Sequence, residues 1–393
     1  MINPLPAVLI GGPPHAGKSV LFYGLTQALR ARGIRHHAIR ACPDGEGNWF
    51  QEGDPETVSR IRMPIRGEWP QAFVNRMCLD LEHRCLPFLV DMGGHPRESQ
   101  ACLLQQCTDS ILLLRADREE YTRLWEHVVA EYHLSPLARV YSQQEGASII
   151  TAQSPFIEGT ISGLERYNPS SAQGPLFEML VDSVATLFQS HSGDREKIIL
   201  EQAPTETVLN LYTSLRTFTS TSTSWRFEML NPLLERLPSN TPLSVYGAGP
   251  NWLYAALAAH TDPQPFYQCD PRFSFGWTQP IALRISSEQF AEAAVETREY
   301  QDVTVLSVQF PYRHLEYFQP DPLPFPSVRP DAGLILNGPL PFWLVTALVR
   351  LYKEAGVAWI APYYVPANKA VVAYSRVMGY VLGDTIPLPF STP

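Results

Sequence analysis

The stretch GPPHAGKS, residues 12–19, decides the fold of the N-terminal part of the chain. It has the form G-x-x-x-x-G-K-[ST] and directly follows a short apolar run, Ala7 to Ile10. A helical pattern then extends from Val20 to Arg32, and Gly33 is a typical stop. Strand, glycine loop and helix thus occur in the order that a phosphate-binding loop requires.

This loop predicts a site for a nucleoside triphosphate, which we expect to be ATP. Backbone N–H groups of the loop and of the helix start would face the phosphates. Lys18 would add a positive charge near the β- and γ-phosphates, and Ser19 would ligate Mg²⁺. The alternative is an ordinary βα turn that matches the pattern by chance.

A second apolar strand, Leu86 to Val90, ends at Asp91. An acidic residue in this place commonly holds Mg²⁺ directly or through water. A simple strand-end cap is the other interpretation. The residues expected to bind ATP are therefore Gly12, His15, Ala16, Gly17, Lys18, Ser19 and Asp91, with Ser19 and Asp91 as the Mg²⁺ ligands.

A third strand, Ser110 to Leu114, precedes a helical pattern from Glu119 to Tyr132. The continuing alternation of strands and helices predicts an α/β domain with a doubly wound parallel sheet. Its reaction stays open. His95 is as typical of an ordinary loop as of a catalytic site, and Arg115 and Arg118 are more typical of solvated charges than of phosphate ligands.

Composition limits the class of protein. A length of 393 residues predicts two or three domains, and 45% hydrophobic residues are typical of a globular chain. The net charge of -9 argues against a protein that coats long nucleic acid. The N-terminus does not resemble a signal peptide, and the longest apolar stretch, Leu340 to Tyr352, is too short to span a bilayer. We therefore expect a cytoplasmic protein that does not bind membranes.

The cysteines show neither a CxxC pair nor a zinc-ligand spacing. In a cytoplasmic protein they are expected to be reduced thiols in packed interiors. They are Cys42, Cys78, Cys85, Cys102, Cys107 and Cys269.

Polar composition at residues 189–193 predicts the end of the first domain. The later run FTSTSTSW, residues 218–225, is typical of either a linker or an edge strand. These features predict a P-loop NTPase domain over residues 1–193 and two further domains over residues 205–297 and 298–393.

An internal repeat is the most informative feature of the C-terminal half. The segment GAGPNWL, residues 247–253, aligns with GPLPFWL, residues 338–344, and the register continues without gaps to Pro271 and Pro362. Each copy predicts a strand, a Gly/Pro turn, a helix that carries Trp-Leu, and a second strand. The predicted strands are residues 242–246, 265–269, 332–336 and 357–360, with earlier ones at 225–229 and 303–310, which together predict two small α+β domains.

The two copies differ at three polar positions. Where the first has His260, Asp270 and Arg272, the second has Leu351, Ala361 and Tyr363. Drift on a solvated surface explains one such change better than three. We infer a site in the first copy that the second has lost, because His, Asp and Arg near a glycine turn supply metal ligation, acid–base chemistry and phosphate binding.

Each copy resembles the CRISPR-associated ring nuclease of the third (Csx-three) type. The first copy carries GAGPNWL, LAAHTDPQPF and CDPRF, whereas the second carries only GPLPFWL and the strand that follows. The resemblance covers residues 205–393, and fusions of such domains to an AAA-type P-loop domain are familiar.

This resemblance implies a manganese-dependent phosphodiesterase that cleaves cyclic tetra-adenylate, a second messenger of type III CRISPR antiviral defence. It implies His260, Asp270 and Arg272 as catalytic residues, with Asp270 and His260 near the Mn²⁺. The turn residues Gly247, Gly249, Pro250 and Asn251 are expected to bind the ligand.

Symmetry adds an expectation about assembly, because a cyclic tetranucleotide is best matched by a symmetric dimer. Two tandem copies in one chain can form a pseudo-dimer, and a homo-oligomer is also expected. Two other functions stay open: a regulator that senses cyclic oligoadenylate without cleaving it, and a nucleotide kinase or other phosphotransferase with an appended binding module.

Overall fold

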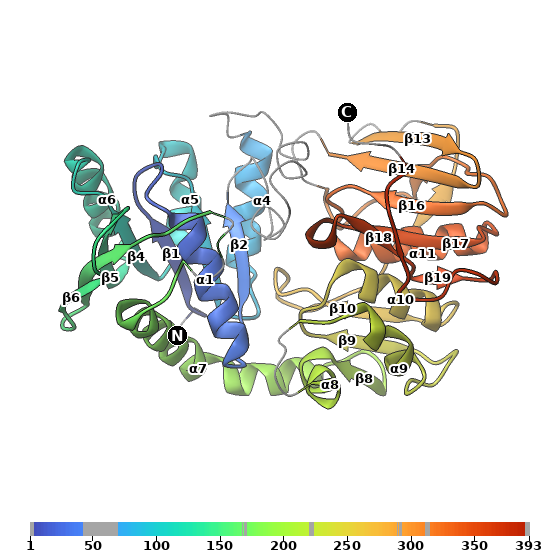
Figure 1. Ribbon diagram of the computed structural model, residues 1–393, viewed down its shortest axis with the longest axis horizontal. Helices are drawn as coiled ribbons and strands as arrows, with labels where there is room; N and C mark the ends of the chain where they lie inside the picture. The colour runs from blue at the N-terminus through green and yellow to red at the C-terminus, as the bar shows by residue number, and fades with distance from the viewer. Residues whose placement is uncertain are drawn as a thin grey trace. The chain divides into compact units, whose positions relative to one another are not determined.

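The computed structural model describes residues 4–41, 70–166, 168, 171–219, 224–288, 290, 293–310 and 315–389. The chain divides into two compact units. The first contains Met1–Glu201 and the short segment Pro271–Gly276, and the second contains Gln202–Asp270 and Trp277–Pro393. Both are shown in Figure 1.

The first unit is built on a seven-stranded sheet with the order β2-β3-β1-β4-β5-β7-β6, in which only β6 is antiparallel to its neighbour. Its strands are β1 (Ala7–Gly11), β2 (His37–Ala41), β3 (Phe88–Met92), β4 (Asp109–Leu114), β5 (Ser135–Gln143), β6 (Ile149–Ala152) and β7 (Ile157–Ser162). Its helices are α1 (Lys18–Ala31), α4 (Gln71–Glu82), the 3-10 turn η1 (Glu98–Gln100), α5 (Ala101–Gln106), α6 (Glu119–Glu131) and α7 (Pro175–Glu201).

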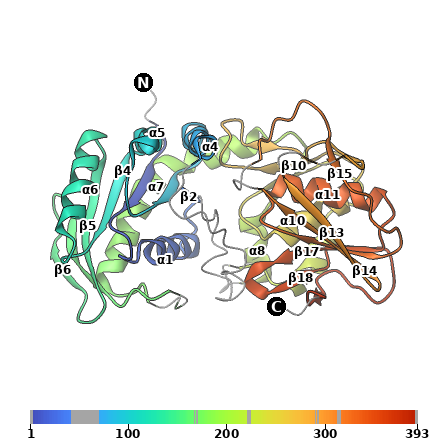
Figure 2. The ribbon, with the colours of Figure 1, turned by 90° about the horizontal axis from the view of Figure 1, so that it is seen from above.

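Helices cover both faces of this sheet (Figure 2). In β1, Val8 and Ile10 join a core with α1 and α7, whereas Ala7 and Leu9 join a separate core with α4, α5 and α6. Side chains alternate between faces along a strand, so an apolar run buried on both sides is what a doubly wound sheet requires. The predicted α/β architecture of the first unit is confirmed.

Two predictions for the first unit are corrected. Residues 189–193 do not end a domain, because α7 continues through them and the division falls after Glu201. Cys78 and Cys102 form a disulfide, so the expectation of reduced thiols is wrong for this pair. Cys85, Cys107 and Cys269 are thiols outside any disulfide, and Cys42 lies outside the described residues.

The second unit contains a four-stranded sheet, β11-β10-β9-β8, and a larger sheet, β13-β14-β16-β17-β18-β20, with β19 paired to β17. A short pair, β12 and β15, lies outside these sheets. The strands are β8 (Thr207–Asn210), β9 (Leu243–Tyr246), β10 (Phe266–Cys269), β11 (Trp277–Thr278), β12 (Leu283–Ile285), β13 (Ala294–Tyr300), β14 (Val303–Gln309), β15 (Leu323–Phe325), β16 (Gly333–Asn337), β17 (Trp359–Tyr364), β18 (Lys369–Val371), β19 (Tyr374–Ser375) and β20 (Thr385–Ile386). The helices are α8 (Leu211–Phe218), the 3-10 turns η2 (Phe227–Met229) and η3 (Val365–Ala367), α9 (Leu230–Leu234), α10 (Asn251–Thr261) and α11 (Phe342–Glu354).

The two halves of this unit share one arrangement. In the first, β8, β9 and β10 are parallel neighbours, and α10 crosses from β9 to β10. In the second, β14, β16 and β17 are parallel neighbours, and α11 crosses from β16 to β17. Parallel strands joined by a crossover helix form an α/β arrangement rather than the predicted α+β one.

Local predictions in this unit have mixed outcomes. The strands expected around both Gly/Pro turns are present, but residues 225–229 form the turn η2 instead of a strand. Phe218 ends α8, so the described part of residues 218–225 is not an edge strand. Both helices, α10 and α11, belong to one hydrophobic core that takes side chains from both sheets.

Candidate functional site

The glycine loop joins β1 to α1 with a backbone that only glycine accepts easily. Gly12 has a φ of 141° and Gly17 has a φ of 89°. A Cβ at Gly12 would lie 1.9 Å from the carbonyl oxygen of Leu113, so any side chain there would collide with β4. These two glycines explain why the loop can turn tightly at the end of a buried strand.

Lys18 is the first residue of α1 and is buried at 7% exposure. Its Nζ donates a hydrogen bond to the carbonyl oxygen of Pro13, at 2.7 Å. The ammonium group therefore lies over the loop, on the side where loop N–H groups and the start of a helix favour negative charge. Ala16 is buried beneath the loop, and His15 is exposed with a φ of 61°.

Ser19 and Asp91 meet, as the sequence predicts for a Mg²⁺ pair. Strands β1 and β3 are parallel neighbours with Ile10 opposite Asp91, which brings the end of β3 beside the glycine loop. Ser19 Oγ donates to Asp91 Oδ2 at 2.8 Å, and Asp91 is 1% exposed. A hydroxyl and a carboxylate oxygen are the hard ligands that Mg²⁺ takes from proteins, so these two residues fit that ion.

Arg40 is a member of this site that the sequence analysis did not find. Strand β2 pairs with β3 in parallel, with Arg40 opposite Asp91, and Arg40 Nε lies 3.5 Å from Asp91 Oδ2. Arg40 is also buried, at 7% exposure. A single arginine in the short strand HAIRA was the available signal, but nothing in the chain order shows that β2 lies beside β3.

The segment after Asp91 packs directly on the glycine loop. A Cβ at Gly94 would lie 2.5 Å from the backbone nitrogen of Pro14, and Trp125 Nε1 donates to the carbonyl oxygen of Gly94 at 3.4 Å. The ring of His95, which is exposed, lies edge-on to Tyr121 at 5.8 Å between ring centroids. Residues 92–95 thus lie beside the expected triphosphate, held between the loop and α6.

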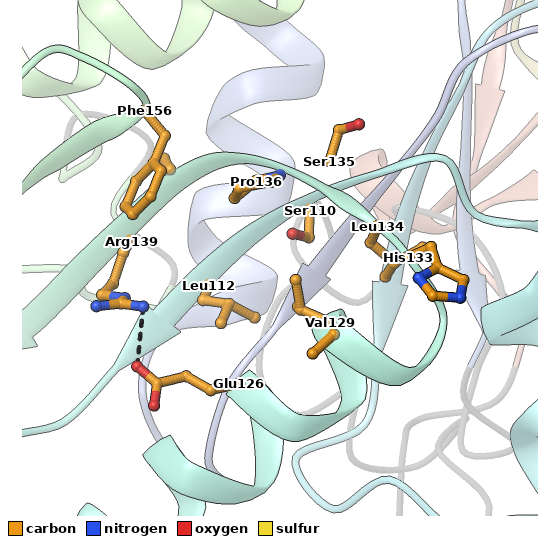
Figure 3. Close-up of a pocket in the computed structure, with 12 residues that line it drawn as sticks. Ser110, Leu112, Glu126, Val129, His133, Leu134, Ser135, Pro136, Arg139 and Phe156 are labelled. Atoms are coloured by element: carbon orange, nitrogen blue, oxygen red, sulfur yellow. Dashed lines mark ion pairs between the residues drawn. The ribbon is translucent and has the colours of Figure 1, made fainter.

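A cavity of about 490 Å³ lies elsewhere in the first unit (Figure 3). It is lined by residues from α6, from the starting halves of β4 and β5, and by Phe156. Arg139 and Glu126 form an ion pair of 2.9 Å at its wall. Because the glycine loop lies at the opposite, carboxyl ends of the parallel strands, this cavity is separate from the glycine loop.

In the second unit, the turn Gly247–Pro250 lies at the carboxyl edge of β9. Gly247 has a φ of 113°, and a Cβ there would lie 2.9 Å from the ring of Tyr212. The buried Tyr254 donates its hydroxyl hydrogen to the carbonyl oxygen of Gly247. Burial raises the pKa of Tyr254 well above its ordinary value, and nearby Cys269, Tyr212 and Asp270 raise it further.

Asp270 lies at this same edge, directly after β10. Gln268 is opposite Val245 in the parallel pair, so the ends of β9 and β10 are level. Asp270 is 9% exposed and is one of the groups that raise the pKa of Tyr254. The structure thus brings Asp270 to the glycine turn, as the sequence analysis proposed.

His260 does not join them. Helix α10 starts at Asn251 beside the turn and runs back to the other edge of the sheet, where β10 begins. At 1.5 Å per residue, its eleven residues span about 16 Å, and His260 lies in the last turn. Arg272 falls in the segment Pro271–Gly276, which groups with the first unit. Because His260 lies at the far end of α10 from Asp270, the expected trio is not assembled.

No cluster of three His, Cys, Asp or Glu side chains suited to a metal occurs in the described part of the chain. His260 and Asp270 lie at opposite edges of their sheet, so they do not fit a shared Mn²⁺ ion. At the matching positions of the second half, Ala361 is buried in β17 and the Tyr363 hydroxyl donates to Asn368 Oδ1 at 2.6 Å. These two replacements are structural residues.

The crossover helices α10 and α11 pack side by side in the second unit (Figures 1 and 2). Near the starts, the Tyr254 and Phe342 rings stack at 4.6 Å, and Asn251 Nδ2 donates to the carbonyl oxygen of Tyr363 at 2.9 Å. Near the ends, Lys353 Nζ donates to the carbonyl oxygen of Ala259 at 2.8 Å. The two glycine turns therefore open toward the same side of the unit.

Among the described residues, no helix combines the length and apolar character needed to cross a bilayer.

Within the second unit, the basic side chains of Arg350 and Lys353 lie at the carboxyl end of α10. There Lys353 forms an ion pair of 3.1 Å with Asp262. Positive charge at the carboxyl end of a helix complements the helix dipole. Because Asp262 pairs with one of these basic side chains, its role is structural.

Comparison with known proteins bears on the C-terminal part. Residues 311–387 match the family model Cas_csx3, described as a CRISPR-associated protein. No curated protein matches the sequence. The solved structures that match include an unliganded crystal structure of a sugar kinase from Janibacter sp. HTCC2649, at 12% identity and a TM-score of 0.22, covering 49% of this chain and 98% of that one. The matched family residues lie in the second half of the repeat, so the presence of two copies of this family stays a prediction. The C-terminal part of the chain is similar to a CRISPR-associated protein.

Proposed function

We propose that the first unit binds a nucleoside triphosphate with Mg²⁺. One observation carries this proposal: the hydrogen bond of 2.8 Å between Ser19 Oγ and Asp91 Oδ2, made beside a glycine loop that ends in Lys18. Loop N–H groups and Lys18 would hold the phosphates, and Ser19 and Asp91 would hold the ion. When bound, Mg²⁺ would neutralise charge on the phosphates. ATP is the expected nucleotide.

Binding of a fluorescent ATP analogue tests this proposal. Lys18→Ala removes the loop's ammonium group and is expected to weaken binding by about 10²-fold, the scale of losing one preorganised charged contact. Lys197→Ala is a matched control, because this lysine of α7 is 76% exposed and forms an ion pair with Glu201 of the same helix. Equal affinity of the wild type and Lys18→Ala would contradict the assignment. Release of ADP in the same preparations tests whether the bound nucleotide is hydrolysed.

We further propose that the second unit binds cyclic tetra-adenylate. The observation behind this proposal is the paired start of α10 and α11, with Tyr254 stacked on Phe342 at 4.6 Å. Two helix starts and two glycine turns on one side offer backbone N–H groups to phosphates in a nearly two-fold arrangement. The match of residues 311–387 to a CRISPR-associated family supports a ligand from that defence system.

Cleavage of the ring requires one proton to leave a ribose 2′-hydroxyl. Its oxygen would attack the adjacent phosphorus while the bond to the 5′-oxygen breaks, leaving a 2′,3′-cyclic phosphate and a 5′-hydroxyl after that oxygen takes a proton. Asp270 is the acidic group at the turn, and we assign it the role of proton acceptor. His260 is too far along α10 for this role, and His260 and Asp270 do not fit a shared Mn²⁺ ion.

Incubation of the whole chain with cyclic tetra-adenylate tests this second proposal. Asp270→Asn keeps the shape of the side chain but removes its basicity, and it is expected to lower the cleavage rate by about 10²-fold or more. Asp262→Asn is the matched control, because Asp262 lies at the other end of α10. Wild-type rates in Asp270→Asn would contradict the assigned role.

The alternative of a signal-sensing regulator predicts a different result in that experiment. The wild type would then bind cyclic tetra-adenylate without consuming it, and the ligand would change the rate of ATP turnover. A phosphotransferase would instead transfer the γ-phosphate of ATP to an acceptor. The expected homo-oligomer is a further proposal, which light scattering of the same preparations measures.

A further inference from the structure

Ser19 and Arg40 both contact the same oxygen of the Asp91 carboxylate. Ser19 Oγ donates to Oδ2 at 2.8 Å, and Arg40 Nε lies 3.5 Å from Oδ2. The side chains of Arg40 and Asp91 are 8% and 2% exposed, so water screens their attraction little. A buried guanidinium thus neutralises the carboxylate that is proposed to hold Mg²⁺.

The other buried arginines of this unit have different surroundings. Arg84 donates to the carbonyl oxygens of Leu5 and Leu81, and Arg76 Nε pairs with Asp80 one helical turn away, at 2.8 Å. Both sets of contacts lie outside the glycine loop, and the Arg76–Asp80 pair lies within α4. Of the buried arginines in the described residues, Arg40 is the one whose carboxylate partner also binds the loop serine.

A divalent cation held by Ser19 and Asp91 would lie next to the Arg40 guanidinium. Like charges a few ångström apart repel strongly where water is excluded. Arg40 therefore acts against the ion at the carboxylate, while its positive charge favours the arrival of a triphosphate. Arg40 thus weakens Mg²⁺ binding and strengthens triphosphate binding. A residue that only stabilises the fold would support both.

We propose that Arg40 is a positioning residue that competes with Mg²⁺ for Asp91 and so sets how strongly nucleotide binding depends on the ion. This inference rests on the proposed function of the first unit. Arg40 neutralises Asp91 when a nucleotide arrives without the ion, and it yields the carboxylate when the ion binds. Mg²⁺ then raises the affinity for ATP by a smaller factor than it would at a site with Ser19 and Asp91 but without the Arg40 charge.

The test measures binding of a fluorescent ATP analogue to the full chain, in EDTA and at saturating Mg²⁺. In Arg40→Ala and Arg40→Gln, affinity in EDTA is expected to fall, and the ratio of the two affinities is expected to rise about tenfold, the scale of one strong charge interaction between neighbouring sites. Arg40→Lys keeps the charge and should restore a ratio near that of the wild type. The two neutral variants differ in polarity, so a folding defect in one leaves the other as a test.

Arg35→Ala is the matched control. Arg35 precedes the same strand, is half-buried and pairs with Glu196 at 3.1 Å, so its loss perturbs a comparable ion pair away from the loop. The ratio should not change in this variant. A ratio in Arg40→Gln equal to that of the wild type within about twofold would overturn the role of Arg40, because a purely structural loss lowers both affinities alike. If the wild type binds no ATP analogue under either condition, the proposed function itself fails, and this inference fails with it.

Discussion

At the scale of single residues, burial decides how a polar side chain behaves. Lys18 and Asp91 are both buried at the proposed nucleotide site. Lys18 donates a hydrogen bond to the carbonyl of Pro13, and Asp91 accepts one from the hydroxyl of Ser19. An unpaired charge is costly in a protein interior. These hydrogen bonds offset that cost and hold the two charged groups in position. Substitution of such a partner should therefore affect nucleotide binding more than it affects the fold.

His36 illustrates the same principle with a proton. It precedes β2, it is buried, and its Nδ1 lies 2.9 Å from the carbonyl oxygen of Ile34. Burial, with a smaller effect from the nearby Arg30, lowers the pKa of His36 to about 3. The folded protein therefore holds this ring neutral at pH values where the unfolded chain, with a His pKa of about 6.5, takes up a proton.

This shift predicts a loss of stability in acid. Above about pH 6.5 the ring is neutral in both states and has no effect; as the pH falls toward 3, the unfolded state gains the proton and the folded state loses stability, by about 2 kcal/mol near pH 5. His36→Leu removes this proton uptake, so its free energy of unfolding should depend less on pH between 6.5 and 4. Urea unfolding at several pH values measures the slope. A slope equal to that of the wild type would show that His36 is not held neutral, and His127→Leu, an exposed site on α6, is the control.

At the scale of elements, the proposed nucleotide site depends on the close approach of two loops. Residues 93–95 follow β3, and Gly94 lies against Pro14 of the glycine loop that follows β1. Parallel pairing of β1 and β3 sets this approach, because it ends both strands at the same edge. Gly94 is required where the two backbones meet.

Gly94→Ala should therefore weaken nucleotide binding. The new Cβ would lie 2.5 Å from the nitrogen of Pro14, and the glycine loop must shift to relieve this contact. Displacement of a binding loop by a fraction of an ångström is expected to cost about tenfold or more in ATP affinity. Titration with a fluorescent ATP analogue measures the effect.

The matched control for this variant is Gly159→Ala. It creates a similar collision, 2.2 Å from the carbonyl oxygen of Ile149, but in β7 and away from the loop. It should lower the melting temperature while the folded protein keeps its ATP affinity. If both variants lose affinity equally, the effect of Gly94 is general destabilisation and not displacement of the glycine loop.

At the scale of the whole molecule, the two halves of the repeat share a single core in the second unit. Every residue of α10 from Trp252 to Ala259 is buried, and a helix buried on all sides needs neighbours on all sides. The core that surrounds it includes Trp343, Leu344 and Leu348 from α11. The halves share one hydrophobic core, so we expect them to unfold as one cooperative unit.

Truncation should reveal this dependence. A chain that ends at Phe310 lacks α11 and is expected to lose the ordered second unit, because α10 would expose its apolar faces, while the first unit keeps its ATP affinity. An isolated fragment of residues 298–393 is likewise expected not to fold. Hydrogen exchange of the truncated chain, compared with the full chain, measures protection in α10. Full protection of α10 without α11 would contradict a shared core.

Sequence alone determined the parts of this protein that depend on local order along the chain. The glycine loop, Lys18, Ser19 and the strand that ends near Asp91 form a pattern whose spacing is set by backbone geometry, so their grouping was predictable. The paired Gly/Pro turns and crossover helices were predictable from the repeat for the same reason. The alternation of strand and helix patterns likewise predicted the doubly wound sheet of the first unit.

Tertiary structure decided what depends on which strands are neighbours and which way a helix runs. Arg40 reaches Asp91 only because β2 pairs with β3, a pairing between segments far apart in the sequence. His260 is separated from Asp270 because α10 carries it to the opposite edge of the sheet, although ten residues of chain suggested proximity. Cys78 and Cys102 likewise meet only when α4 packs beside α5. Spacing along a chain fixes contacts within a turn or a loop, whereas contacts across a sheet follow from strand order, which no local pattern encodes.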